Sequence, residues 1–211
     1  PKTYEHINPE EVGNVRNIVV SDQSGKSNIV SRLNSIGINF KQDDPKIKKL
    51  LEEVKDREFI GYSYDGADAS FELLANRLLG KVPEYLKVES YDVNVSKSKK
   101  ISTKANVVFL IDGKKIKCSG EGNGPVNALD NAIRSNFKKV EKYYNYFSDL
   151  KLLDYKVRIL NTGTEATTRV LIESTDKTGK SWFTVGVSPN IIEASFKALI
   201  DSLDYKLYKE K

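Results

Sequence analysis

Three glycines, Gly120, Gly122 and Gly124, stand just before Pro125 and the start of a helical pattern. Glycine leaves its backbone N–H approachable, and the N-terminus of a helix concentrates partial positive charge. Such a loop can bind a carboxylate or a phosphate without a dedicated basic side chain. The run lacks the Lys-Ser/Thr ending of a nucleotide-binding P-loop. The glycines therefore predict either a site for a small anion or merely a tight strand-to-helix turn.

A second helix start, at residues 186–190, repeats part of this arrangement and is followed by two isoleucines that offer apolar walls. Together the two loops could hold the carboxylate, the ammonium and the branched side chain of an amino acid. Asp130 is the candidate partner of the ammonium, although a carboxylate on a helix surface is more often simply solvated. The predicted effector-binding residues are Gly122, Gly124, Pro125, Val126, Asn127, Ala128, Asp130, Gly186, Ser188, Asn190, Ile191 and Ile192.

Other reactive side chains are sparse, because His6 is the only histidine and Cys118 the only cysteine. No Cys/His cluster has the spacing of a metal site, and no Ser/His/Asp set is possible without His6. Cys118 alternates in register with Ile116, which predicts an inert core thiol. We therefore expect no metal and no cofactor in this chain, and the sequence does not resemble a self-sufficient enzyme.

The composition is that of an ordinary globular protein, with 39% hydrophobic and 30% charged residues among 211. No apolar run reaches the roughly 18 residues of a membrane helix, and no signal peptide is recognisable, so we expect neither a membrane nor export. A single cysteine suits the reducing cytoplasm. The 34 basic and 29 acidic residues intermingle, which favours a solvated surface over nucleic-acid binding. Because the chain opens at Pro1 and contains no Met, we expect a piece of a longer protein.

The elements that must position the loops fall into three zones, residues 1–22, 23–80 and 85–211. The first is a short extended or looped segment. The second shows apolar residues at helical spacing three times, with Gly37, Pro45 and Gly80 as stop and start signals. A linker at residues 80–84 follows. The sequence thus predicts a helical subdomain ahead of a different kind of domain.

The third zone changes to period two and contains a duplication, with repeats at about 85–147 and 150–211. Each repeat reads as three strands and a helix, and Pro125 and Pro189 stand at matching helix starts. Asp112-Gly113 is a hairpin signal in the first repeat. An apolar stripe from Val126 to Tyr144 predicts one long helix after it. The fold class is therefore α+β, with two β-β-β-α repeats that must pair their sheets, or pair two chains, to cover their apolar faces.

Several long motifs, in the right order over nearly the whole chain, resemble the region that follows the catalytic barrel in citramalate synthases of the isopropylmalate/homocitrate synthase family. The matching stretches are residues 3–7 (TYEHI), 11–14 (EVGN), 21–28 (SDQSGKSN), 66–74 (GADASFELL), 121–130 (EGNGPVNALD), 154–158 (DYKVR) and 184–195 (TVGVSPNIIEAS). By this resemblance residues 1–22 end a first linker subdomain, residues 23–80 form a second, and residues 85–211 form a regulatory dimerisation domain.

The resemblance implies that a longer parent protein condenses acetyl-CoA with an α-keto acid at a divalent metal, in a (β/α)8 barrel that this chain lacks. His6 and Asn14 match positions that reach into that active site, where the His would help to deprotonate the acetyl-CoA methyl group. A tyrosine role known in some relatives has no counterpart near Asn14. This chain alone should be inactive.

In the family that the chain resembles, the regulatory domain forms a homodimer and binds the end product of its pathway. We consider four interpretations of the chain. The resemblance favours a citramalate synthase that answers to isoleucine. The second interpretation is an isopropylmalate synthase that answers to leucine. The third is a basic module similar to a double-stranded-RNA-binding domain, although no Lys/Arg stripe stands at the helix starts. The fourth is a dimerisation module without a ligand.

Overall fold

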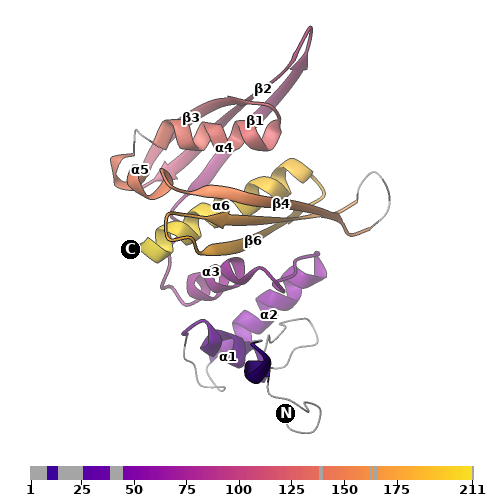
Figure 1. Cartoon of the computed structure of the whole chain (residues 1–211), viewed down its shortest axis with the longest axis vertical. Helices are drawn as coiled ribbons and strands as arrows, with labels where there is room; N and C mark the ends of the chain where they lie inside the picture. Colours follow the sequence, from indigo (N-terminus) through magenta and orange to yellow (C-terminus); the bar gives the residue numbers. More distant parts are fainter. Residues whose placement is uncertain are drawn as a thin grey trace.

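The computed structural model describes residues 9–13, 26–38, 45–137, 140–161, 163 and 166–210. The zone predicted to be helical, residues 23–80, contains three helices, whereas a short 3-10 helix lies in the segment predicted to be extended or looped. The elements are the short 3-10 helix η1 (Pro9–Val12) and the helices α1 (Lys26–Ser35), α2 (Pro45–Phe59) and α3 (Asp68–Leu78). We refer to α1, α2 and α3 as the helical subdomain (Figure 1).

The first repeat is an antiparallel sheet of β1 (Lys87–Lys97), β2 (Ile101–Ile111) and β3 (Lys114–Gly122), followed by α4 (Pro125–Asn136). Asp112 and Gly113 join β2 to β3, and both have positive φ, 49° and 76°. Two adjacent residues with positive φ are what a tight type I′ hairpin turn requires. The hairpin predicted from Asp-Gly is therefore confirmed.

The second repeat has the same plan. Its sheet is formed by β4 (Lys151–Ile159), β5 (Thr168–Thr175) and β6 (Ser181–Ser188), and α6 (Ile191–Glu210) follows. The strand order within each sheet is sequential and all neighbours are antiparallel. The α+β fold with two β-β-β-α repeats is thus confirmed.

The prediction of one long helix in the first repeat was wrong. Helix α4 ends at Asn136, and a separate helix α5 (Glu141–Phe147) begins after Val140, whose backbone is not helical at φ −114° and ψ 76°. The Phe137 ring packs edge-on against Phe147, with centroids 4.9 Å apart, and against Phe109 of β2. The turn lets Phe137 and Phe147 meet in one aromatic cluster, whereas residues ten apart on a straight helix are about 15 Å apart along its axis.

One hydrophobic core holds side chains from both repeats, which lie next to each other in Figure 1. It contains Val107 and Phe109 of the first sheet, Ile172 of the second, and apolar residues of α4 and α6 such as Leu129 and Leu203. Each repeat therefore covers apolar side chains of the other, so neither repeat needs a further layer of secondary structure to bury them.

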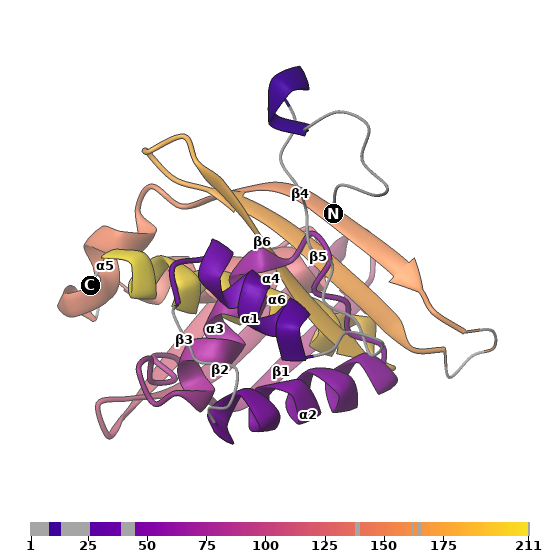
Figure 2. The ribbon, with the colours of Figure 1, turned by 90° about the horizontal axis from the view of Figure 1, so that it is seen from below.

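The helical subdomain covers the opposite face of the second sheet, and Figure 2 shows its helices lying across that sheet. Val185 and Val187 of β6 share a buried cluster with residues of α1, α2 and α3. The Val185 N–H donates to Ser70 Oγ of α3 at 3.0 Å, so the subdomain occupies a hydrogen-bonding group on the edge strand. The subdomain and the second repeat thus form one packed unit.

Candidate functional site

In the first predicted loop, two of the three glycines stand where a larger residue would have no room for its side chain. A Cβ added to Gly120 would lie 2.6 Å from Ala132 Cα, and one added to Gly122 would lie 2.5 Å from the backbone nitrogen of Ala128. Both contacts are with the backbone of α4, which therefore rests directly on β3. Gly120 and Gly122 thus have a packing role that the sequence interpretation did not include.

Gly124 differs from these two glycines. It is the N-cap of α4 with an extended backbone at φ −165° and ψ 173°, it gives the helix no side-chain cap, and a Cβ there would meet nothing within 4 Å. Pro125 at the first helical turn has no N–H to donate. Val126 is half-buried and Asn127 is exposed. The start of α4 is therefore open on the outside and lacks a side-chain cap, as an anion site requires.

Two other residues predicted for this loop are already engaged. Both Asp130 oxygens accept hydrogen bonds from Arg134 Nε at 2.8 Å, and Arg134 also donates to the Leu150 carbonyl. Ala128 is fully buried and faces β3. Asp130 would therefore have to share its carboxylate with Arg134 in order to meet an ammonium group.

The second helix start is capped by its own side chains. Asn190 Oδ1 accepts from the N–H groups of Ile192 at 2.8 Å and Glu193 at 3.4 Å, and Ser188 Oγ donates to Glu193 Oε2 at 2.7 Å. A Cβ on Gly186 would lie 2.8 Å from the backbone nitrogen of Ala198, so this glycine also permits close helix packing. The amides of the α6 start are thus less available than those of the α4 start.

The structure brings the two helix starts to the same end of the molecule (Figure 1), since each helix follows the third strand of its repeat and α4 packs against α6. Ile191 is 47% exposed there, and Ile192 is half-buried against the core. The predicted effector residues are therefore spread over two neighbouring helix starts, and whether they bind an amino acid stays a prediction.

The remaining sequence expectations have mixed outcomes. Cys118 is buried on β3, so the predicted core thiol is confirmed. The predicted catalytic residues His6 and Asn14 lie outside the described residues. Among the residues that the structure describes, no three metal-ligating side chains gather. No helix in that part of the chain is long and apolar enough to cross a membrane.

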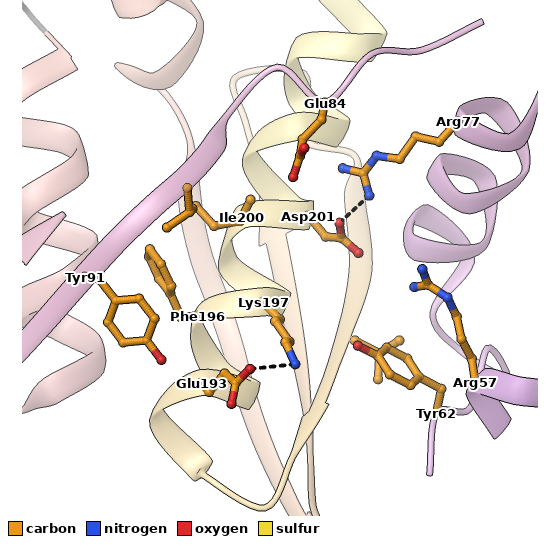
Figure 3. Close-up of a pocket in the computed structure, with 12 residues that line it drawn as sticks. Arg57, Tyr62, Arg77, Glu84, Tyr91, Glu193, Phe196, Lys197, Ile200 and Asp201 are labelled. Atoms are coloured by element: carbon orange, nitrogen blue, oxygen red, sulfur yellow. Dashed lines mark hydrogen bonds and ion pairs between the residues drawn. The ribbon is translucent and has the colours of Figure 1, made fainter. Parts of the chain in front are cut away.

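Sequence reasoning missed a cavity between the helical subdomain and the repeats (Figure 3). Its volume is about 360 Å³, and its lining includes Arg57 and Arg77 from the helical subdomain, Tyr91 of β1, and Lys197 and Asp201 of α6. These residues are far apart in the chain and form no local motif. No sequence signal could therefore have assembled them.

Two carboxylates of α6 hold the cavity wall to α3 through Arg77. Arg77 donates to Asp201 Oδ1 at 2.9 Å and to Asp204 Oδ2 at 2.7 Å. Asp204 is fully buried, and within the described part of the chain its other oxygen has no hydrogen-bond partner. Burial raises the pKa of Asp204 to about 7, against the opposing attraction of Arg77. This ion pair joins the helical subdomain to the last helix of the second repeat.

Sequence comparison places this arrangement in a known class. Residues 65–207 match the family described as the LeuA allosteric (dimerisation) domain, and residues 1–59 match the family described as homocitrate synthase post-HMGL domain-like. The chain therefore belongs to the LeuA allosteric domain family, and it is a regulatory region.

Several relatives of this chain share one name, (R)-citramalate synthase. The chain is 46% identical to an (R)-citramalate synthase of Geobacter sulfurreducens and 47% identical to one of Aquifex aeolicus, in both cases over its whole length. It is 40% identical to an (R)-citramalate synthase of Sulfolobus acidocaldarius. It covers 40% of the length of the first two relatives and 38% of the third. The chain thus spans about two fifths of the proteins that it resembles.

Proposed function

We propose that this chain is the feedback-regulatory and dimerisation region of an (R)-citramalate synthase, and that its effector is isoleucine. The observation that carries the proposal is that (R)-citramalate synthases match the chain from end to end, with an allosteric domain over residues 65–207. The parent enzyme would condense acetyl-CoA with pyruvate at a divalent metal bound outside this chain. His6 and Asn14 would contribute to catalysis only in that longer protein.

The proposed effector site lies at the two helix starts. The N-terminus of α4 has no side-chain cap and supplies partial positive charge for the carboxylate, although the Asn123 N–H of the preceding loop already donates to Asn127 Oδ1 at 3.1 Å. Val126 and Ile191 offer apolar surface for a branched side chain, because one is half-buried and the other 47% exposed. Leucine, the alternative effector, has the same zwitterion and an isomeric side chain. Binding studies must therefore compare the two.

A homodimer is proposed from the family's description and from apolar side chains that one chain leaves uncovered. Val95 is 55% exposed on β1 and Ile101 is 62% exposed on β2, whereas Val157 and Ile159 on β4 are 42% and 68% exposed. Exposed apolar residues on two sheets are typical of surfaces that a second copy covers. Light scattering should therefore give twice the mass of one chain.

The test of the effector is thermal unfolding and calorimetry with L-isoleucine, L-leucine and L-valine, and with D-isoleucine as the control. A ligand present at a hundredfold excess over its Kd stabilises the native state by about 2.7 kcal/mol. For a chain of this size that is a rise in melting temperature of roughly 5–10 °C. If none of the L-amino acids raises the melting temperature at millimolar concentration, the effector proposal is wrong.

The location of the site is tested with Gly124→Leu. The extended backbone and the open space at this position allow a side chain without strain, so the fold should persist. The leucine would cover the start of α4, and the isoleucine-dependent shift should disappear. Ser98→Leu, on an exposed residue of the β1–β2 hairpin, is the matched control. Undiminished binding to the Gly124 variant would place the effector elsewhere.

A further inference from the structure

The cavity between the helical subdomain and the repeats has a polar end, built from two elements. Arg57 at the end of α2 donates through Nε to Glu53 at 2.6 Å, and its guanidinium carbon lies 5.6 Å from the Tyr62 ring centroid. An arginine carries five N–H donors, so one bond to Glu53 leaves donors for another partner. Figure 3 shows the Tyr62 hydroxyl and the Lys197 ammonium, from opposite walls, pointing toward the same part of the cavity. The Lys197 ammonium already meets Glu193 at 2.8 Å and the Val187 carbonyl at 3.4 Å, so this end offers a carboxylate the remaining N–H groups of Arg57 and Lys197 and the Tyr62 hydroxyl.

The other end of the cavity is apolar. Phe196 of α6 is 4% exposed, and its ring packs on Tyr91 of β1 with centroids 4.8 Å apart. Val88 and Ile200 complete this end. Figure 3 shows the two rings and Ile200 on the side of the cavity away from Arg57. An aliphatic group would leave water there and gain about 25 cal/mol for each Å² of apolar surface buried.

Acidic side chains balance the cations of the lining. Asp201 is fully engaged, because its oxygens accept from Arg77 and from Ser70. Glu193 pairs with Lys197 at 2.8 Å, and Glu84 lies exposed at the rim. Both oxygens of Glu193 are likewise occupied, by Lys197 and by Ser188, so Glu84 is the carboxylate that can meet an ammonium. A cavity with hydrogen-bond donors for a carboxylate, an apolar end and acidic groups nearby suits a zwitterion better than a simple anion.

We propose that this cavity is a second binding site, distinct from the helix starts, and that it takes a small aliphatic α-amino acid. The ligand carboxylate lies against Arg57, Tyr62 and Lys197, and its side chain lies against Phe196 and Ile200. The volume of about 360 Å³ falls within the range of small-molecule pockets, which begins at about 300 Å³. The site does not depend on the proposed effector site at α4.

Occupancy of this cavity would link elements on both sides of it. Arg57 belongs to the helical subdomain, whereas Phe196 and Lys197 belong to the last helix of the regulatory repeats. A ligand bound to both stabilises the arrangement in which the two parts are docked. The helical subdomain would therefore respond directly to this ligand, without a signal from the α4 start.

The experiment is calorimetric and NMR titration of the whole chain with L-isoleucine and L-leucine. The variant Arg57→Gln removes the cation but keeps a donor for Glu53, and it should weaken binding at this site at least about tenfold, the loss expected for a charge-assisted hydrogen bond. Lys48→Gln, on the same helix and exposed, is the matched control and should bind like the wild type. Ile200→Trp should fill the apolar end and abolish binding.

The outcomes separate the two sites. Amide shifts at Val88, Phe196 and Ile200 that are lost in Arg57→Gln but kept in Gly124→Leu support the cavity. Binding that is lost only in Gly124→Leu, with these three amides unmoved, overturns the cavity site and leaves the proposed effector site standing. Binding that is lost only in Arg57→Gln supports the cavity and refutes the helix-start location. An absence of binding by either amino acid refutes both sites.

Discussion

The substitution Gly120→Ala tests the close approach of α4 to β3. A methyl group at this position would lie 2.6 Å from Ala132 Cα and 2.8 Å from the carbonyl carbon of Asn131. Carbon atoms in contact are ordinarily about 3.5–4.0 Å apart, so α4 would have to move by about 1 Å. Both neighbours are helix backbone, which cannot rotate away as a flexible side chain can.

The expected cost follows from two opposing effects. Overpacking a close-packed interior costs typically about 1–3 kcal/mol, and a clash with backbone favours the upper end of that range. Alanine in a strand is favoured over glycine by roughly 0.5–1 kcal/mol, which offsets part of the cost. A net loss of about 2 kcal/mol corresponds to a melting temperature lowered by roughly 4–8 °C in a chain of this size.

The assay is thermal and urea unfolding, followed by circular dichroism and by fluorescence of the single tryptophan, Trp182. Gly124→Ala is the matched control, because a Cβ there meets nothing within 4 Å. Replacing this N-cap should lower stability by no more than about 1 kcal/mol. If Gly120→Ala unfolds at the same temperature as Gly124→Ala, the contact between strand and helix is not as close as described, and the packing role of the glycines is wrong.

Two further substitutions probe the docking of the helical subdomain. Burial raises the pKa of Asp204 in the native state to about 7 from 3.8. Its contribution to stability is therefore full below about pH 4 and is lost as the pH rises through 7. The substitution Asp204→Asn should flatten the pH dependence of the urea midpoint between about pH 4 and 8, and an unchanged dependence would contradict this assignment. Ser70→Ala leaves the buried Val185 N–H without its acceptor and should cost about 1–3 kcal/mol. Ser98→Ala on the exposed hairpin should be neutral, and equal urea midpoints for the two alanine variants would disprove the role of Ser70.

Local patterns predicted the parts of the fold that depend on neighbouring residues. Asp112-Gly113 indicated a hairpin because few other pairs adopt two positive φ angles. Pro125 indicated a helix start, and α4 begins there. The same reasoning failed at Val140, where the apolar spacing continues but the chain turns. The aromatic contact between Phe137 and Phe147 favours the turn, and no sequence period reports such a contact.

The candidate site was predictable only as a list of helix-start residues. The sequence left open whether the glycines served a ligand or a turn. The structure shows a third role for Gly120, Gly122 and Gly186, which is direct packing of a helix on a strand. It also shows that Asn190 caps α6, whereas α4 has no side-chain cap. These differences depend on distances between elements, which the residue types alone do not fix.

The sequence by itself determined the two repeats, their strands and helix starts, and the kinship with a regulatory region, because periodicity, turn chemistry and motif order are properties of neighbouring residues. Only the tertiary structure decided that the helical subdomain docks on β6 through Ser70, and that Arg57, Tyr91 and Lys197 line one cavity. Such contacts join residues far apart in the chain. They are set by how whole elements pack, and packing depends on every side chain of the interface at once.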